Sequence, residues 1–148
     1  PIPMMVSKLE QLEGIAIIDE RTKLIAKHFL PGALTLVLPV DPRLDKSYNN
    51  GLETIAIRIP DEEFVLSLID ELDTPLLVTS ANQSGAPTAL KYEDVLEQLP
   101  NIDGIVLGKC RALQASTIVD CTKENLKILR EGPISLEELV CVIENKSK

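Results

Sequence analysis

The chain is organised around a small polar stretch, Thr79-Ser80-Ala81-Asn82-Gln83-Ser84-Gly85-Ala86-Pro87-Thr88. It directly follows the apolar run Pro75-Leu76-Leu77-Val78, which is short, bounded by turn-forming residues and typical of a buried strand. In open α/β sheets, ligands bind beyond the carboxyl ends of strands, where hydroxyls and backbone N–H groups face a charged group. A ligand-binding loop is one interpretation. An ordinary surface loop is the other, because such clusters commonly follow strands.

Two further stretches predict the central strands of a sheet. Residues 33–39 are almost continuously apolar, which indicates a sheet covered on both faces. Residues 54–60 alternate strictly, with Thr54, Ala56 and Arg58 on one face and three isoleucines on the other. A guanidinium on that face needs an anionic partner, because a buried unpaired charge is costly. For Arg58, the residues leave open an anionic ligand or an internal salt bridge.

Helices are predicted from capping residues and from apolar residues spaced at 3.6-residue intervals. The expected caps are, in chain order, Ser7 in a capping box with Glu10, Asp19, Asp61 and Ser135. The apolar stripe of residues 64–72 is expected to lie in the core, and residues 91–99 have the periodicity of a further helix. These helices alternate with the strands above, as in α/β proteins.

Three short strand candidates follow one another in the second half of the chain: residues 104–107, 116–120 and 126–130. Such a run after strand–helix–strand units indicates a mixed sheet. At 148 residues, the chain fits one domain and can bury a core of useful size. The predicted fold class is α/β, with a twisted mixed sheet flanked by helices.

Composition argues against several classes of function. Apolar residues make up 45% of the chain and charged residues 26%, and no apolar run reaches the roughly 18 residues of a membrane span. A net charge of −8 argues against a broad nucleic-acid-binding face, although a local basic cleft stays open. Two Phe, two Tyr and no Trp leave little material for base stacking. These two features make a small molecule the expected ligand. The first residues resemble no targeting peptide, so we expect a cytoplasmic protein.

Neither a disulfide framework nor a metal centre is predicted. Cys110, Cys121 and Cys141 are odd in number and lack C-x-x-C spacing, so reduced and mostly packed thiols are expected. His28, the only histidine, falls on or beside a packing face of its helix. It has no carboxylate or cysteine at ligand spacing, and we expect neither general-base nor metal-binding duty for it.

Five motifs follow one another along the chain, and the third and fourth of them are specific in combination. They are Pro31-Gly32-Ala33-Leu34-Thr35, Thr54-x-Ala56-x-Arg58-x-Pro60, Ser80-Ala81-Asn82-x-Ser84-Gly85, Ser116-Thr117-Ile118-Val119-Asp120 and Ile128-Leu129-Arg130-x-Gly132. With these motifs the chain resembles the YrdC/TsaC family of threonylcarbamoyl-AMP synthases from its first residue to about Ile143. The resemblance implies a twisted α/β sheet with a concave ligand cavity. It also implies condensation of L-threonine, bicarbonate and ATP into threonylcarbamoyl-AMP and pyrophosphate, for threonylcarbamoyladenosine in tRNA.

The resemblance, carried over position by position, implies two sets of binding residues. The set implied for ATP is Thr54, Ser80, Asn82, Thr88 and Arg130, and the set implied for L-threonine is Arg58, Val78 and Ser116. ATP is a substrate, and Mg²⁺ is expected to be required. A carbamate that attacks the α-phosphate needs no catalytic nucleophile or general base from the enzyme, so positioning and charge stabilisation are expected to account for catalysis.

The family pattern includes an opening strand with a threonine-binding loop and a Lys-x-Arg motif, both ahead of the position of Pro1. Neither stands at the front of this sequence, which opens at Pro1. We expect residues 1–148 to form a single YrdC-like domain that is N-terminally incomplete and has reduced or no activity. An exposed sheet edge is expected to favour a dimer.

Two other classes of function stay open at this point. Members of the family that the chain resembles are also described as RNA-binding or ribosome-associated, which would include double-stranded RNA binding. A noncatalytic adaptor in a tRNA-modification complex is the remaining alternative. Salt-dependent RNA binding would support the first, whereas ATP-dependent release of pyrophosphate would support the synthase.

Overall fold

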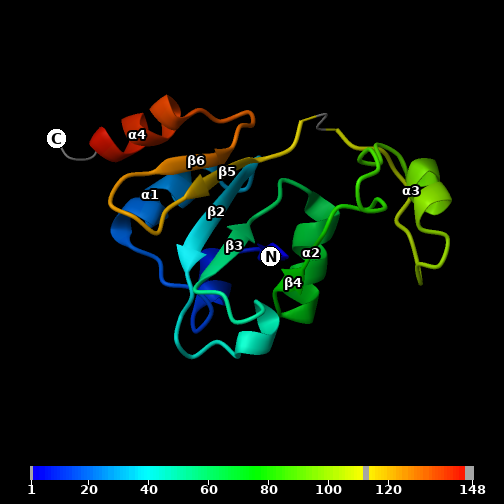
Figure 1. The fold of residues 1–148 in the computed structure, drawn as a ribbon, viewed down its shortest axis with the longest axis horizontal. Helices are drawn as coiled ribbons and strands as arrows, with labels where there is room; N and C mark the ends of the chain where they lie inside the picture. Colours follow the sequence, from blue (N-terminus) through cyan, green and yellow to red (C-terminus); the bar gives the residue numbers. More distant parts are fainter. Residues whose placement is uncertain (1, 112–113, 146–148) are drawn as a thin grey trace. The chain divides into compact units, whose positions relative to one another are not determined.

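The computed structural model describes residues 2–111 and 114–145 (Figure 1). Its elements are β1 (Met4–Met5), a 3-10 helix (Leu9–Leu12), α1 (Glu20–Phe29), β2 (Leu34–Pro39), a 3-10 helix (Lys46–Tyr48), β3 (Thr54–Arg58), α2 (Glu63–Leu72), β4 (Leu76–Leu77), α3 (Tyr92–Gln98), β5 (Thr117–Asp120), β6 (Lys127–Arg130) and α4 (Leu136–Glu144). The chain divides into two compact units, residues 1–78 with 115–148 and residues 79–114. The first unit holds the sheet with α1, α2 and α4, and the second holds α3.

The strands of the first unit form one six-stranded sheet in the order β4-β1-β3-β2-β5-β6. The β1–β3 and β2–β5 pairs are parallel, whereas the β1–β4, β2–β3 and β5–β6 pairs are antiparallel. The predicted mixed sheet is therefore confirmed. Strands β4 and β6 form its two edges, and the expected dimer through an edge stays a prediction.

Strand β2 is an inner strand, between β3 and β5, and buries one of its faces in the core. Leu34, Leu36 and Leu38 lie on that face and belong to the hydrophobic core, while Thr35 and the half-buried Val37 lie on the other face. In the neighbouring strand β3, Ile55 and Ile57 are also buried and alternate with half-buried residues. The predicted alternation of β3 is thus confirmed, and it leaves one face of the strand for polar side chains.

The caps predicted for α1 and α4 are confirmed. Asp19 accepts a hydrogen bond of 2.7 Å from the backbone N–H of Thr22 at the start of α1. Ser135 and Glu138 form a capping box at the start of α4, with bonds of 3.2 and 2.8 Å. Each cap satisfies N–H groups that have no partner inside the helix. The two helices pack against each other, and Ile25 and Leu139 carry their apolar faces into the core.

Helix α2 differs from prediction at its start and on its surface. It begins at Glu63, and the residue that caps it is Glu62, not Asp61. Only Ile69 of its apolar stripe is buried, whereas Phe64 and Leu72 are 51% and 52% exposed. The predicted core stripe is therefore wrong for most of its length. Periodicity shows which residues share a face of a helix, but not whether another element covers that face.

The capping box predicted at Ser7 is also wrong. The segment is a 3-10 helix whose preceding residue, Lys8, makes no side-chain cap. The backbone N–H of Ser7 donates to Gln11 Oε1 at 2.8 Å, and its hydroxyl, which lies 3.2 Å from the same oxygen, donates to Asp70 of α2. Ser7 thus ties the opening segment to α2 because this long-range partner competes with the local cap.

The second unit contains one confirmed and one wrong prediction. Helix α3 forms as residues 91–99 predict. Residues 104–107 do not form a strand, and a single bridge joins Lys91 to Lys109 instead. Val106 and Leu107 are 60% and 71% exposed. An apolar run becomes a strand only where a partner strand accepts its backbone hydrogen bonds, and this one has none among the described residues.

The thiols and the histidine have distinct environments. All three cysteines are free, but only Cys121 is buried, so the expectation of mostly packed thiols is wrong for Cys110 and Cys141. His28 is exposed and lies edge-on to Phe29, with ring centroids 4.7 Å apart.

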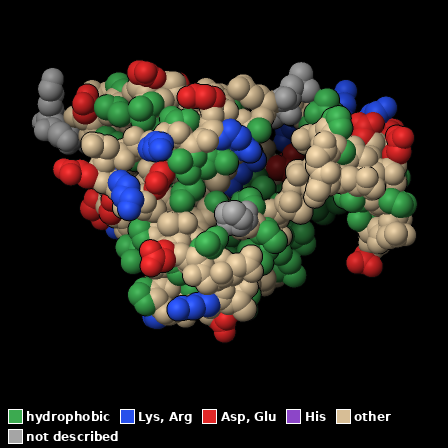
Figure 2. Space-filling view, viewed as in Figure 1, with side chains coloured by type: hydrophobic (Ala, Val, Ile, Leu, Met, Phe, Trp, Pro, Cys, Tyr) green, Lys and Arg blue, Asp and Glu red, His purple; other side chains and the backbone are tan. Residues whose placement is uncertain are grey.

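No helix in the described part of the chain has the length and apolarity that a membrane crossing needs. On the face drawn in Figure 2, acidic and basic side chains are interspersed.

We expect the three thiols to differ strongly in reactivity. Burial raises the pKa of the Cys121 thiol to about 12, so almost no thiolate is present at pH 8. Iodoacetamide at pH 8 should therefore modify Cys121 at least about a hundredfold more slowly than exposed Cys110 and Cys141. Peptide mapping by mass spectrometry measures all three rates at once. Equal rates for the three would contradict the burial of Cys121, and unfolding in urea should abolish the difference.

Candidate functional site

Four polar side chains gather where neighbouring strands of the first unit end. Arg58 ends β3 and Arg130 ends β6, while Thr35 lies near the start of β2 and Ser116 immediately precedes β5. These strands are consecutive in the sheet, and Ile118 of β5 pairs with both Thr35 and Arg130. Because β3 and β6 run against β2 and β5, two strand ends and two strand starts meet at the same end of the sheet. We call Thr35, Arg58, Ser116 and Arg130 the strand-end cluster.

Ser116 contacts two of the other three residues of the strand-end cluster, Thr35 and Arg130. Its Oγ lies 2.8 Å from Thr35 Oγ1, and both residues are buried. Arg130 donates to the Ser116 carbonyl from Nε at 3.0 Å and from Nη2 at 2.8 Å, and Nη2 also donates to Ser116 Oγ at 3.0 Å. These bonds hold the guanidinium in one orientation. They leave its Nη1 without a protein partner among the described residues.

Arg58 is held far more loosely than Arg130. Its Nε donates to the carbonyl of Gly32 at 3.2 Å, and in the described part of the chain its two terminal nitrogens have no protein partner. Burial, and then the positive charge of Arg130, lowers the pKa of Arg58 below its ordinary value. None of the ion pairs among residues 2–111 and 114–145 involves Arg58. The internal salt bridge is thus not found there, and the geometry favours an anionic ligand.

A backbone crossing behind Ser116 holds the cluster in place. Thr117 Oγ1 donates to the Ile134 carbonyl at 2.8 Å and accepts from the Ile134 N–H at 3.0 Å. Gly132 passes so close that a Cβ atom there would lie 2.3 Å from Thr117 N and 2.7 Å from the carbonyl carbon of Ser116. Only glycine permits this approach, which sets the distance between the start of β5 and the segment after β6.

Two other predicted residues of the first unit lie away from the strand-end cluster. Thr54 starts β3, four residues before Arg58, and is thus about 13 Å from it along the strand. Both face the same side of the sheet, because side chains of a strand alternate. Val78 follows β4, where its N–H donates to the Pro3 carbonyl at 2.9 Å. The predicted ATP role of Thr54 and threonine role of Val78 stay predictions.

The remaining predicted residues lie in the second unit, on the loop that follows β4. Ser80 and Thr88 are exposed. Asn82 instead braces the loop, since its Nδ2 donates to the carbonyls of Gln83 and Ala86 at 2.9 and 3.2 Å. Its predicted contact with ATP, like those of Ser80 and Thr88, stays a prediction. The Oδ1 of Asn82 is buried without a partner among the described residues, so it is open to a donor from a ligand.

Helix α3 supports this loop from within the same unit. Gln98 Oε1 accepts from the Gln83 N–H at 3.1 Å, and Gln98 Nε2 donates to the Pro87 carbonyl at 3.2 Å. A hollow of about 470 Å³ lies between the loop and the helix, and Thr88, Asp94 and Glu97 are among its lining residues. Two carboxylates in this lining make it a poor place for a phosphate group without a cation.

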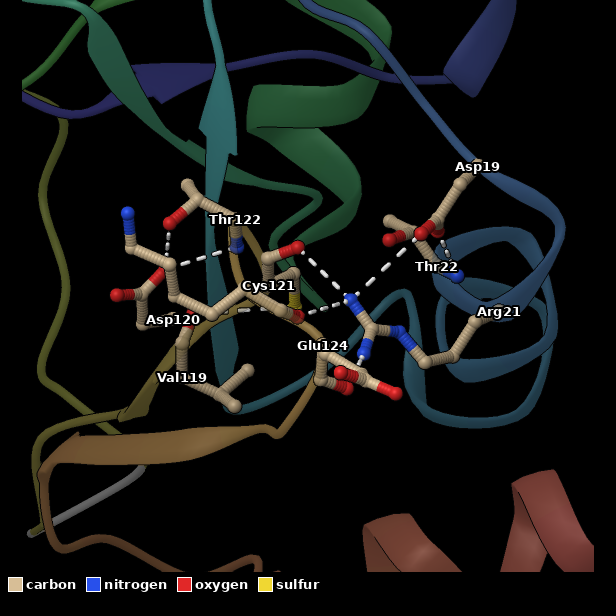
Figure 3. A network of polar contacts seen from close by, with 9 residues as sticks. Asp19, Arg21, Thr22, Val119, Asp120, Cys121, Thr122 and Glu124 are labelled. Atoms are coloured by element: carbon tan, nitrogen blue, oxygen red, sulfur yellow. Dashed lines mark hydrogen bonds and ion pairs between the residues drawn. The ribbon is translucent and has the colours of Figure 1, made fainter.

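A second polar network joins α1 to the turn between β5 and β6 (Figure 3). Arg21 Nη2 donates to the carbonyls of Cys121 and Lys123 at 2.9 Å each, and Nη1 donates to the carbonyl of Glu124. Asp19 lies 3.6 Å from the same guanidinium. The side chains border a hollow of about 450 Å³. Since three backbone carbonyls occupy both terminal nitrogens of Arg21, this network is a structural clamp on the turn.

Sequence reasoning identified Arg58, Ser116 and Arg130 but missed Thr35. Thr35 stands within an apolar strand, where a β-branched residue needs no functional explanation. Its hydroxyl in an otherwise apolar run was the available signal, because a buried hydroxyl requires a hydrogen-bond partner. That partner, Ser116, is 81 residues away in the sequence and could not be assigned before the β2–β5 pairing was known.

The fold and the strand-end cluster define a mixed α/β-sheet protein with two arginines and a buried hydroxyl pair at one end of the sheet. A family model described as "Telomere recombination", that of the Sua5, YciO and YrdC proteins, matches residues 1–132. The chain belongs to this family. The resemblance to YrdC proteins expected from its motifs is thereby confirmed.

Proteins similar to this chain are known from bacteria and archaea. The threonylcarbamoyl-AMP synthase of Bacillus subtilis is 42% identical over 141 residues, which cover 93% of this chain and 40% of that protein. The crystal structure of Pyrococcus abyssi Sua5 complexed with L-threonine matches with a TM-score of 0.88 at 37% identity, over 97% of this chain and 43% of that one. Escherichia coli YciO, at 23% identity and a TM-score of 0.77, shares the fold. The chain thus spans about two fifths of the length of the Bacillus subtilis and Pyrococcus abyssi proteins.

Proposed function

We propose that this chain carries the substrate-binding sheet of an L-threonylcarbamoyladenylate synthase. The reaction would condense L-threonine, bicarbonate and ATP into threonylcarbamoyl-AMP and pyrophosphate, for the threonylcarbamoyladenosine modification of tRNA. Relatives named threonylcarbamoyl-AMP synthase and a related structure complexed with L-threonine support the proposal. The observation that carries it is the guanidinium of Arg58, which faces no carboxylate among the described residues although Arg130 lies near it.

The two arginines would have different duties. The free terminal nitrogens of Arg58 form a planar fork that matches a carboxylate, so Arg58 would bind the carboxylate of L-threonine. Ser116, beside it in the cluster, would donate a hydrogen bond to the same substrate. Arg130, which has only Nη1 left, would contact the phosphate groups of ATP as a fixed positive charge. Binding of either anion would relieve the repulsion between the two cations.

The chemistry needs placement more than it needs reactive side chains. The amine of threonine adds to bicarbonate with loss of water, and a carbamate oxygen then attacks the α-phosphorus of ATP as pyrophosphate leaves. Charge stabilisation by arginine and by backbone N–H groups would lower the barrier for this departure. Thr54, Ser80, Asn82 and Thr88 are the further residues that we propose around ATP.

We expect Mg²⁺ to arrive with ATP as part of the substrate. Among residues 2–111 and 114–145, no group of three or more His, Cys, Asp or Glu side chains is placed to hold a metal ion. Mg²⁺ commonly binds through one or two carboxylates together with substrate phosphates, so a dedicated protein cage is not required.

Ser116→Ala is expected to weaken the binding of L-threonine more than that of ATP. Loss of one hydrogen bond to a charged group costs about 1.5–3 kcal/mol, or roughly tenfold to a hundredfold in affinity. Isothermal titration of the chain with L-threonine and with Mg·ATP measures both affinities, and release of pyrophosphate with all three substrates reports turnover. Ser67→Ala, on the exposed face of α2, is the control and should change neither affinity. Weakened ATP binding with unchanged threonine binding would contradict the assignment.

A further inference from the structure

The buried pair of hydroxyls formed by Thr35 and Ser116 holds more hydrogen-bond donors than the protein uses. The two oxygens are 2.8 Å apart and share one hydrogen bond. Thr35 and Ser116 are 5% and 4% exposed, so water does not readily supply further partners. Each hydroxyl carries one proton, and one shared bond uses only one of the two protons. The other proton has no acceptor among the described residues.

Arg130 limits how the two hydroxyls can share their protons. Its Nη2 donates to Ser116 Oγ at 3.0 Å, which occupies one lone pair of that oxygen. If Ser116 donated to Thr35, the proton of Thr35 would be left without an acceptor inside the strand, which incurs the full desolvation cost of a donor. If Thr35 donates instead, Ser116 Oγ accepts two bonds and its own proton is free to point at a ligand. Either arrangement leaves one proton without a protein acceptor among the described residues, but only the second places that proton on Ser116, the hydroxyl that the proposed function puts beside the substrate.

We propose that Thr35 is a positioning residue, which donates to Ser116 Oγ and thereby directs the Ser116 proton toward an acceptor oxygen of L-threonine. The inference rests on the proposed function. It requires that Thr35 act through Ser116 and not by touching the substrate. It also predicts that the hydroxyl of Thr35 matters and its shape does not, since valine has the same branched shape without the donor.

Thr35→Val is expected to weaken the binding of L-threonine about fivefold to thirtyfold, and Thr35→Ser, which restores the donor, is expected to remain within about threefold of the parent chain. Isothermal titration calorimetry with L-threonine measures both. Thr22→Val is the matched control, because Thr22 is also a buried threonine of the first unit, 1% exposed, but lies in α1. It tests for a general effect of losing a buried hydroxyl, and should leave the affinity for L-threonine unchanged.

The decisive measurement combines the two hydroxyls. In a chain that already carries Ser116→Ala, Thr35→Val should have no further effect on L-threonine affinity, because its route to the substrate has been removed. A Thr35→Val variant that binds L-threonine as tightly as the parent chain would overturn the inference alone, as would losses that multiply in the double variant. A parent chain that binds no L-threonine would overturn the proposed function, and the inference with it.

Discussion

Replacement of Arg58 by methionine is expected to weaken L-threonine binding about tenfold to a hundredfold while the folded state stays as stable as before. The loss follows from removal of a charge-assisted contact with the substrate carboxylate, worth about 1.5–3 kcal/mol. Stability should be preserved because, within the described part of the chain, Arg58 has one hydrogen bond to protein, 3.2 Å long, and is repelled by Arg130. Methionine is of similar length and apolar, so we expect the free energy of unfolding to change by less than about 1 kcal/mol or to rise.

Two measurements separate the binding role of Arg58 from a structural one. Calorimetric titration gives the affinity for L-threonine, and urea unfolding gives the stability of the same sample. Arg43→Met is the control, since Arg43 forms an ion pair with Asp41 at 2.8 Å on another part of the first unit. It should bind L-threonine normally. An Arg58→Met chain that is strongly destabilised, or that binds threonine unchanged, would show that the guanidinium serves the fold instead of a ligand.

Gly132→Ala is expected to lower the free energy of unfolding by about 2–3 kcal/mol. The added Cβ would approach Thr117 N to 2.3 Å and Thr117 Oγ1 to 2.7 Å, and a backbone atom of a central strand cannot yield as a flexible side chain can. The segment after β6 must therefore move, which breaks the two hydrogen bonds between Thr117 and Ile134. Thermal unfolding should show a midpoint lower by roughly 4–12 °C for a chain of this size.

A glycine without neighbours supplies the control for this prediction. A Cβ atom on Gly104 would meet nothing within 4 Å, so Gly104→Ala should change the free energy of unfolding by less than about 0.5 kcal/mol. Because Ser116 directly precedes Thr117, Gly132→Ala should also weaken L-threonine binding, while Gly104→Ala should not. Equal stability of the two variants would show that the backbone crossing at Gly132 is not tightly packed.

Local patterns in the sequence were sufficient for the elements that depend on neighbouring residues. The apolar run of β2, the alternation of β3 and the caps Asp19 and Ser135 all specify structure within a few residues, and all are confirmed. The motifs were also sufficient to identify the family, because each keeps its spacing along the chain. Side-chain period and cap chemistry act over one or two turns or strand positions, and for this reason they can be read directly from sequence.

Only the tertiary structure decided which polar groups meet and which apolar groups are covered. The partner of Thr35 is Ser116, 81 residues away, and the β2–β5 pairing determines it. Arg58 could have formed a salt bridge by any sequence criterion, yet its described neighbours are a backbone carbonyl and a second arginine. The apolar stripe of α2, including Phe64, has the period of a core helix and is still largely exposed. Burial and pairing depend on contacts between distant segments, and periodicity along one segment contains no information about them.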